Sequence, residues 1–356
     1  MKALHIHAGP VARRHIEQHG LRPSDVALVP AAAGGPKGLI LSHIDRQLFG
    51  SWFNEVDHPL HLVGASIGAW RMAAAAMPNP VKAFEDLAQV YISQRYDLEP
   101  GKKMPTPASV SRGFEETLRA FFERDLQSVL HHPTRRLHVL TSRGRHVLRA
   151  GGRVGAPLGF AGLVLANAVS RRGVGAFLER HVFSTPGDRL PIALDDQPTR
   201  HITLTEANFL PAVQASCSIP FVLDGVRNIP GTRRATHWDG GLIDYHLHWD
   251  YAGMPAGLVL YPHFQRTIVP GWLDKVFKSR HRPTPGLDNV VTLVPNPEWV
   301  ASLPNGKLPD RNDFKALGEA ERIRDWTKAV AESARLADEW QMWLDKGCPV
   351  EVIQPL

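Results

Sequence analysis

The chain has 356 residues, of which 43% are hydrophobic, enough for one large α/β domain with a buried sheet or for two smaller domains. Its two cysteines, Cys217 and Cys348, form no C-x-x-C pattern and no disulfide framework, which indicates a reducing compartment. The 41 basic and 35 acidic residues give a formal net charge of +6, which favours negatively charged partners such as anionic lipid surfaces. No recognition motif or aromatic-interleaved basic stripe is present, so we expect no nucleic-acid partner.

The sequence gives two indications of where the protein resides. Its start, M-K-A-L-H-I-H-A-G-P-V-A-R-R, lacks the apolar stretch of a signal peptide. The longest apolar stretch, residues 156–170, is too short and too broken to cross a bilayer as a helix. We therefore expect a cytoplasmic protein, or one that is bound peripherally to a membrane.

Short apolar strands alternate with glycine loops and helices along the chain. The sequence predicts a strand at 26–30 that runs into a glycine loop and then a helix at 39–49. A strand at 60–63 is followed by a turn and an alanine-rich helix that Pro78 ends. Further strands are predicted at 137–140, 201–204, 257–261, 290–294 and 350–353. One long helical pattern is predicted at 313–346. This alternation predicts an α/β fold with three αβα layers and a mostly parallel central sheet.

The chain shows no internal repeat and no low-complexity linker. The segment 266–288, rich in proline and glycine, is interpreted as an excursion from the core and not as a domain boundary. We therefore expect a single domain over 1–356. Its motifs lie within a core at about 26–250, and residues 265–356 are expected to form a helix-rich extension packed on that core.

A nucleophilic serine is predicted at Ser66, within the sequence G-A-S-I-G that joins a strand to a helix. Small residues at Gly64 and Gly68 let the backbone turn sharply and lift the serine hydroxyl clear of the sheet. The helix that follows points its positive amino-terminal end at the reacting centre. This placement between strand and helix indicates a nucleophile elbow.

A second glycine motif, A-A-G-G-P-K-G, also follows a strand and precedes a helix. The residues of its loop are Gly34, Gly35, Pro36, Lys37 and Gly38. Glycines let backbone N–H groups converge on an anion, and both a phosphate and an oxyanion are candidates, as is a simple tight turn. The loop lacks the G-K-[S/T] ending of a Walker motif and the G-x-G-x-x-G spacing of a dinucleotide site. Because a serine elbow follows one βα unit later, an oxyanion hole is favoured, with Lys37 adding positive charge.

A carboxylate base is predicted at Asp239 in the sequence W-D-G-G-L, although D-G-G alone is also a common turn. With A-S-C-S-I-P-F at 215–221, these motifs resemble the patatin-like family of serine acyl hydrolases over about 26–250. The resemblance implies a Ser66–Asp239 dyad without histidine, an oxyanion hole in the glycine loop, and no metal or cofactor. It also implies a phospholipid or another acyl-ester lipid as substrate and leaves the oligomeric state open. The sequence L-I-D-Y-H-L-H-W-D after D-G-G departs from the family's usual N-x-P continuation, which bears on the shape of the substrate.

Four alternatives stay open at this point. An ordinary α/β-hydrolase would pair Ser66 with a later acid and with a histidine such as His263 or His281. An acyltransferase would pass through the same acyl-enzyme, and a lipid sensor would keep the fold without the chemistry. A metal-dependent hydrolase would instead draw its ligands from a short cluster of acids and histidines. That cluster consists of Asp239, Asp244, His246, His248 and Asp250.

Two segments are candidates for contact with lipid. The segment 271–282 (G-W-L-D-K-V-F-K-S-R-H-R) combines apolar and basic residues in the way that an interfacial helix requires. The residues spaced to share one face of a short helix are Trp272, Leu273, Val276 and Phe277. The apolar stretch 158–169 is a second candidate for membrane contact or for a lid. These features predict peripheral contact with an anionic membrane, the alternative being a surface helix packed on the core.

Overall fold

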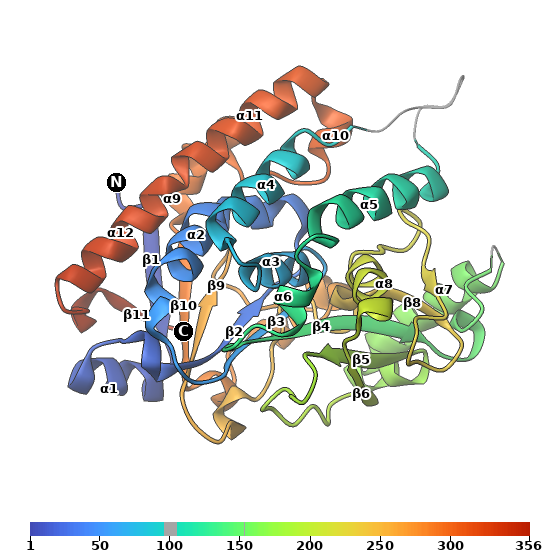
Figure 1. Cartoon of the computed structure of the whole chain (residues 1–356), viewed down its shortest axis with the longest axis horizontal. Helices are drawn as coiled ribbons and strands as arrows, with labels where there is room; N and C mark the ends of the chain where they lie inside the picture. Colours follow the sequence, from blue (N-terminus) through green and yellow to red (C-terminus); the bar gives the residue numbers. More distant parts are fainter. Residues whose placement is uncertain (96–104, 153) are drawn as a thin grey trace.

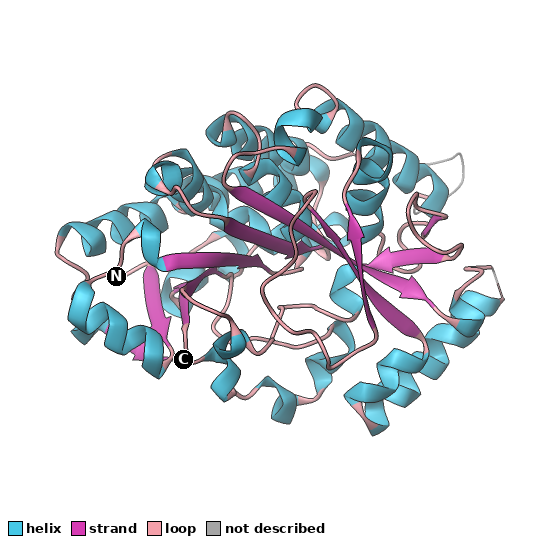
Figure 2. Cartoon of the chain, turned by 60° about the horizontal axis from the view of Figure 1, so that its bottom comes forward, coloured by secondary structure: helices cyan, strands magenta, loops and turns pink. Residues whose placement is uncertain are grey.

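In a computed structural model of the protein, helices cover both sides of a mixed, mostly parallel sheet (Figures 1 and 2). The structure describes residues 1–95, 105–152 and 154–356. The strands are β1 (Leu4–Ala8), β2 (Val26–Ala31), β3 (Leu60–Ala65), β4 (Arg135–Gly144), β5 (Leu178–Ser184), β6 (Thr199–Thr203), β7 (Val226–Arg227), β8 (Thr236–Asp239), β9 (Leu258–Pro262), β10 (Val290–Pro295) and β11 (Ile353–Pro355). Their order is β11-β1-β10-β9-β2-β3-β4-β5-β6, with β8 paired to β4 and β7 paired to β8.

The helices differ in what they contact. Helix α3 lies directly on β2, β3 and β4, whereas α2, α4, α11 and α12 pack against one another beside it. The helices are α1 (Pro10–His19), α2 (Ser42–Gly50), α3 (Ile67–Ala75), α4 (Pro80–Ile92), α5 (Pro107–Phe122), α6 (Leu126–Leu130), α7 (Gly155–Val169), α8 (Glu206–Ser216), α9 (Pro297–Ala301), α10 (Asp313–Ala316), α11 (Glu319–Glu332) and α12 (Ala334–Asp345). Among the described residues, no helix has both the length and the apolar character needed to span a membrane.

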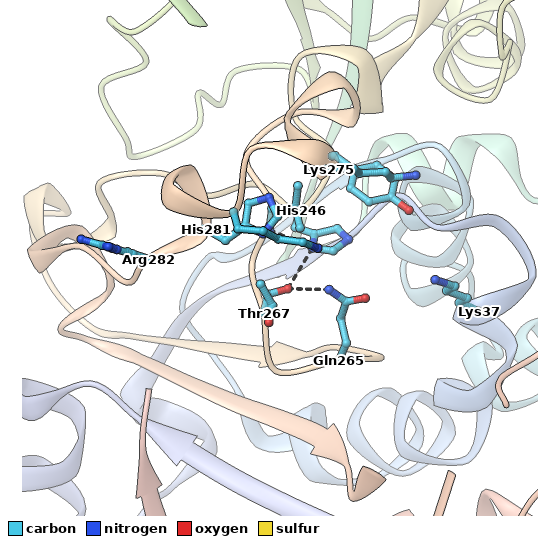
Figure 3. A pocket seen from close by; sticks show the side chains of 10 residues that line it. Lys37, His246, Gln265, Thr267, Lys275, His281 and Arg282 are labelled. Atoms are coloured by element: carbon cyan, nitrogen blue, oxygen red, sulfur yellow. Dashed lines mark hydrogen bonds between the residues drawn. The ribbon is translucent and has the colours of Figure 1, made fainter. Parts of the chain in front are cut away.

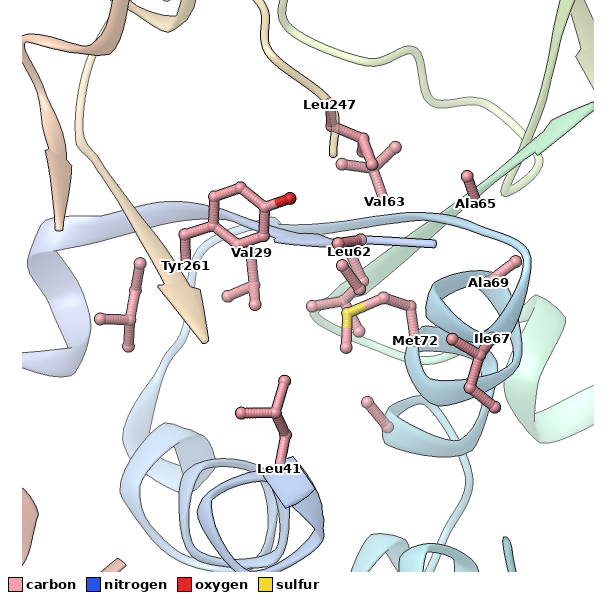
Figure 4. Close-up of a cluster of buried hydrophobic side chains, with 14 of the residues drawn as sticks. Val29, Leu41, Leu62, Val63, Ala65, Ile67, Ala69, Met72, Leu247 and Tyr261 are labelled. Carbon is pink, nitrogen blue, oxygen red and sulfur yellow. The ribbon is translucent and has the colours of Figure 1, made fainter. Parts of the chain in front are cut away.

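The central strands β2 and β3 are buried on both faces. They pair in parallel, with Val29 opposite Leu62, and both of these side chains are inaccessible to solvent. Figure 4 shows Leu41 and Met72 gathered against them. Two-sided burial is typical of parallel strands that are covered by helices on both faces. Because neighbouring parallel strands end at the same edge of a sheet, the loops after β2 and β3 lie next to each other.

The sheet is mixed because several of its strands run against their neighbours. Strand β1 is antiparallel to β10, and β4 is antiparallel to both β5 and β8, whereas β10, β9, β2, β3 and β4 form one continuous parallel run. The predicted α/β fold with a mostly parallel sheet between helices is confirmed. Sequence analysis missed β1, β5, β7 and β8. Strands β1, β5 and β8 pair at the flanks of the parallel run, and β7 pairs with β8.

The carboxyl-terminal segment 265–356 differs from its expected form in two ways. The helical pattern at 313–346 is three helices, α10, α11 and α12, separated at Leu317–Gly318 and at Ser333. The segment also supplies β11 and β10, the second of which lies between β1 and β9. It is therefore part of the central sheet and does not only pack on it.

Candidate active site

Ser66 occupies the sharp turn between β3 and α3. Its backbone has φ 56° and ψ −129°, a conformation that residues other than glycine rarely adopt. Close packing requires glycine on either side. A Cβ on Gly64 would lie 2.3 Å from the carbonyl carbon of Gly68, and a Cβ on Gly68 would lie 2.0 Å from the carbonyl oxygen of Ala31. The turn places the Ser66 hydroxyl at the carboxyl edge of the sheet and at the amino-terminal end of α3.

Asp239 ends β8 and lies beside Ser66. The Ser66 hydroxyl donates a hydrogen bond to Asp239 Oδ2 at 2.8 Å, and the Gly241 N–H donates one to Asp239 Oδ1 at 2.7 Å. The two residues are only 5% and 6% exposed. Burial raises the pKa of Asp239 to about 6, because desolvation of the carboxylate outweighs the two hydrogen bonds that favour it. Asp239 is therefore suited to accept a proton near neutral pH.

The segment 215–221 holds Ser66 and Asp239 in place together. Helix α8 ends at Ser216, whose Oγ accepts a hydrogen bond from the Ser66 N–H at 2.9 Å. Two residues later, the carbonyl oxygen of Ser218 accepts a hydrogen bond from the Asp239 N–H at 3.0 Å. Sequence analysis noted this segment but missed its positioning role. The two serines of A-S-C-S were the available signal.

The glycine loop contributes to the site through part of its length. Gly34, Gly35 and Lys37 line the cleft at Ser66. Gly35 has φ 58° and begins the 3₁₀ helix η2 (Gly35–Leu41), whose first N–H groups have no partner within the helix. Pro36 has no N–H to donate, and Gly38 does not line the cleft but packs so that a Cβ would lie 3.3 Å from Ile67. Of the five loop residues predicted for an oxyanion hole, Gly34, Gly35 and Lys37 therefore line the cleft at Ser66.

A cleft of about 620 Å³ opens at Ser66. Its walls are mainly apolar and come from α7, from the turn after α8 and from the segment after β9. The apolar residues lining it include Pro157, Phe160, Ala161, Leu163, Val164, Ile219, Phe221, Val222, Trp272 and Leu273. Its polar lining includes Lys37, Lys275, Asp310, Arg311 and Asn312. Sequence analysis missed Lys275 and Arg311 as site residues, because neither belongs to a motif.

The two histidines considered for a triad do not meet Ser66. The His263 ring contacts the backbone of Gln265 and packs against Phe264, and the His281 Nε2 lies 2.8 Å from the carbonyl oxygen of Asp274. No histidine lines the cleft at Ser66 within the described part of the chain. The α/β-hydrolase alternative therefore has no histidine in position.

The acid–histidine cluster considered for a metal is dispersed among other partners. Asp244 is buried and forms an ion pair with Arg180 at 2.6 Å, and it also accepts a hydrogen bond from Trp249 Nε1 at 2.9 Å. His246 accepts a hydrogen bond from the Val269 N–H at 3.0 Å. Over residues 1–95, 105–152 and 154–356, no three histidine, cysteine or acidic side chains are placed to share a metal ion. The residues that the structure describes therefore offer no ligand set for the metal-dependent alternative.

The two candidate lipid-contact segments both border the cleft. The segment 271–282 does not form the expected single helix. It forms two 3₁₀ helices, η8 (Trp272–Val276) and η9 (Lys278–His281), separated at Phe277. Trp272 and Val276 are exposed, whereas Leu273 and Phe277 are half-buried, so the four residues do not share one exposed face. The stretch 158–169 lies within α7.

No curated protein matched the chain. The family model described as patatin-like phospholipase matches residues 32–246, well over half of the chain. The match contains the glycine loop, Ser66 and Asp239, which are the motifs on which the resemblance was based. The chain therefore belongs to the patatin-like phospholipase family.

Proposed function

We propose that the protein hydrolyses carboxylic esters of phospholipids or related lipids, with Ser66 as nucleophile and Asp239 as general base. Family membership implies lipid acyl hydrolase activity. The observation that carries the residue assignment is the 2.8 Å hydrogen bond from Ser66 Oγ to Asp239 Oδ2, inside a mainly apolar cleft. A hydroxyl that donates a hydrogen bond to a buried carboxylate can pass its proton to that carboxylate as the oxygen attacks the ester carbonyl.

The first half-reaction forms an acyl-enzyme. Ser66 Oγ bonds to the ester carbonyl carbon while its proton passes to Asp239 Oδ2, and the carbonyl oxygen becomes an oxyanion. Collapse of this intermediate breaks the carbon–oxygen bond to the alcohol, which leaves with the proton from Asp239. The product is an ester between the acyl chain and Ser66.

The second half-reaction releases the acid. Asp239 takes a proton from a water molecule that attacks the acyl-Ser66 carbonyl, and it returns the proton to Ser66 Oγ as that bond breaks. Asp239 then regains its original state, so the cycle needs no further reactant than water.

The N–H groups of Gly34 and Gly35 are assigned to the oxyanion. They lie at the start of η2, beside Ser66 on the adjacent strand end. A carboxylate is a weaker base than imidazole, so the oxyanion donors must supply much of the rate enhancement. One such donor is worth roughly 10²–10³ in rate.

The rim of the cleft suits contact with a lipid aggregate. The elements that line the cleft also carry exposed apolar side chains, with exposed fractions of 66% for Leu158, 69% for Leu165 and 88% for Val169 on α7, 63% for Phe221 after α8 and 75% for Val276 on η8. Exposed apolar patches mark interaction surfaces. Basic residues follow them at 278–282, so an anionic membrane is the favoured partner.

Buried polar contacts support α7 and η8 beneath this rim. Asp274 is 1% exposed and accepts a hydrogen bond from Asn167 of α7 at 3.1 Å. It also pairs with Arg280 at 2.7 Å and with Arg171 at 3.1 Å. These contacts join α7 to η8.

Labelling with a fluorophosphonate tests the assignment. We expect covalent modification of Ser66, located by mass mapping of the labelled peptide. Ser66→Ala should lose both labelling and hydrolysis of a soluble short-chain ester. In the Ser216→Ala variant, the label should still be found on Ser66. Modification of a different residue, or full hydrolysis by Ser66→Ala, would show that the nucleophile lies elsewhere.

A further inference from the structure

A second cavity, of about 570 Å³, adjoins the cleft at Ser66. The two cavities share Lys37, Tyr245 and Lys275. Figure 3 shows Lys37 on one side of the second cavity and Arg282 on the other, with His246 and Thr267 between them. The mechanism above leaves this second cavity unused.

The charged side chains that line this cavity are positive. Four cationic side chains, those of Lys37, Lys275, Lys278 and Arg282, line it, and no aspartate or glutamate among the described residues does so. Within the part of the chain that the structure describes, none of the four forms an ion pair with a carboxylate. Arg280, in the same segment, is by contrast paired with Asp274 at 2.7 Å. Desolvation, together with the nearby charges of Lys37 and Arg311, lowers the pKa of Lys275 to about 8. Such a cavity attracts an anion.

His246 adds a buried polar nitrogen to the same lining. Its Nδ1 lies 3.0 Å from the Val269 backbone nitrogen and 3.2 Å from the Thr267 carbonyl oxygen, and burial lowers the pKa of the ring, which is therefore neutral. In the described structure, its Nε2 is buried without a hydrogen-bond partner. A buried polar nitrogen without a partner is costly, and the tautomer that carries the proton on Nε2 would donate it to an anionic oxygen.

We propose that this basic cavity is a head-group site, which gives the enzyme a preference for lipids whose phosphate head group carries a net negative charge. The proposal rests on the ester hydrolysis proposed above. With the ester at Ser66 and the acyl chain in the apolar cleft, the alcohol side of the lipid extends past Lys37 and Lys275 into the second cavity. Since no carboxylate of the residues that the structure describes lines that cavity, no anionic side chain among them balances the cation of a zwitterionic choline head group.

The test uses the full-length enzyme and neutral detergent micelles that contain phosphatidylglycerol or phosphatidylcholine with identical acyl chains. We expect the wild type to have a lower KM for phosphatidylglycerol. Lys278→Ala/Arg282→Ala should raise that KM roughly tenfold, with kcat and the phosphatidylcholine KM little changed, because charge-assisted contacts to phosphate are removed. Added salt should reduce the wild-type preference.

The matched control is Lys328→Ala/Lys346→Ala, which removes the same charge from exposed positions on and after other helices. It should keep the preference, which separates the cavity from a general attraction to anionic micelles. Hydrolysis of a soluble uncharged ester by all three proteins shows that the active site is intact. Absence of that hydrolysis in the wild type would instead contradict the proposed function.

A second arm distinguishes a lipid head group from a free phosphate ligand. Inorganic phosphate and glycerol 3-phosphate are titrated while thermal unfolding is followed in the wild type and in Lys278→Ala/Arg282→Ala. Preference for phosphatidylglycerol that is lost in the double variant supports the head-group site. Equal KM values for the two lipids, or a preference that the double variant retains, overturn it. Stabilisation by free phosphate that depends on Lys278 and Arg282, without lipid preference, also overturns it in favour of a soluble ligand.

Discussion

The reacting edge of the sheet and the apolar wall of the cleft are built in different ways. At the edge, Gly64, Gly68 and Gly35 satisfy steric demands of the backbone, and a Cβ at Gly68 would lie 2.0 Å from a carbonyl oxygen. The wall consists of side chains from α7, from the turn after α8 and from η8, which are far apart in sequence. The edge therefore tolerates few residue types, whereas the wall requires only apolar side chains in the right places.

The same difference divides the expected effects of substitution. Groups at the edge contact the atoms that react, so their loss should lower kcat. Residues of the wall and rim contact the acyl chain or the lipid surface, so their loss should weaken binding and leave kcat on a soluble ester nearly unchanged. Any wall residue whose loss abolished turnover on a soluble ester would break this division.

The largest effect is expected for Asp239→Asn. Asparagine keeps the shape of the side chain and an acceptor for the Gly241 N–H, but it cannot take the Ser66 proton. General-base catalysis contributes about 10²–10⁴ in rate, and kcat on a soluble ester should fall by that factor. His263→Ala and His281→Ala should retain most of the activity. A comparable loss in either histidine variant would restore the triad alternative.

Gly35→Ala should produce the next largest effect. Gly35 has φ 58°, so a side chain strains the loop that presents the oxyanion donors. We expect kcat to fall by roughly 10²–10³ while KM changes little, as for a contact made in the transition state. Gly113→Ala is a suitable control, because a Cβ there meets nothing within 4 Å. A higher KM with unchanged kcat would assign the loop to ground-state anion binding.

The pH dependence of the wild type follows from the buried base. Asp239 must be ionised to act, and burial raises its pKa to about 6. The value of kcat/KM on an uncharged soluble ester should therefore rise with pH through about 6 and fall about tenfold per pH unit well below it. A profile that is flat between pH 5 and 7 would exclude Asp239 as the ionising base.

The sequence predicted more of the reacting edge of the sheet than of the wall of the cleft. Ser66 and the glycine loop were predicted because strained turns leave glycines at fixed spacing, and Asp239 was predicted from the family resemblance. The parallel run β2, β3 and β4 was predicted from its apolar stretches. Lys275 and Arg311 were missed because tertiary placement alone brings them to the cleft. The role of Ser216 was missed although its segment was noted, because the motif does not say which backbone N–H the serine accepts from. The expected helix at 271–282 breaks at Phe277, because its fold follows from contacts with Asp274 and α7 and not from periodicity.

The rim should govern binding to lipid surfaces. Leu165→Ser/Val169→Ser changes two of the most exposed apolar residues of α7, neither of which lines the cleft. We expect binding to anionic vesicles, measured by co-sedimentation, to weaken about tenfold or more, since buried apolar area is lost. Hydrolysis of a soluble ester should be unchanged. The matched control is Val11→Ser/Met342→Ser, which changes exposed apolar residues of α1 and α12. Equal losses in both variants would mean that α7 has no special role.

The smallest expected effect is on the free energy of unfolding, which the buried, ionised Asp239 lowers. The raised pKa of Asp239 means that the folded protein holds its proton more tightly than the unfolded chain, whose value is near 3.8. The ionised carboxylate therefore costs stability, fully above pH 6 and not at all below about 4. Asp239→Asn removes this cost, so the variant should be more stable than the wild type at pH 8, by at most about 3 kcal/mol, and the gain should vanish by pH 4.

Asp244→Asn provides the opposite case for that measurement. Asp244 is equally buried but pairs with Arg180 at 2.6 Å, so its loss leaves a buried cation short of a partner and should lower the melting temperature. Thermal unfolding of both variants at pH 8 and pH 4 compares the two carboxylates directly. If the Asp239→Asn protein is less stable than the wild type at pH 8, the ionised carboxylate stabilises the fold. The catalytic aspartate would then not lower the stability of the protein.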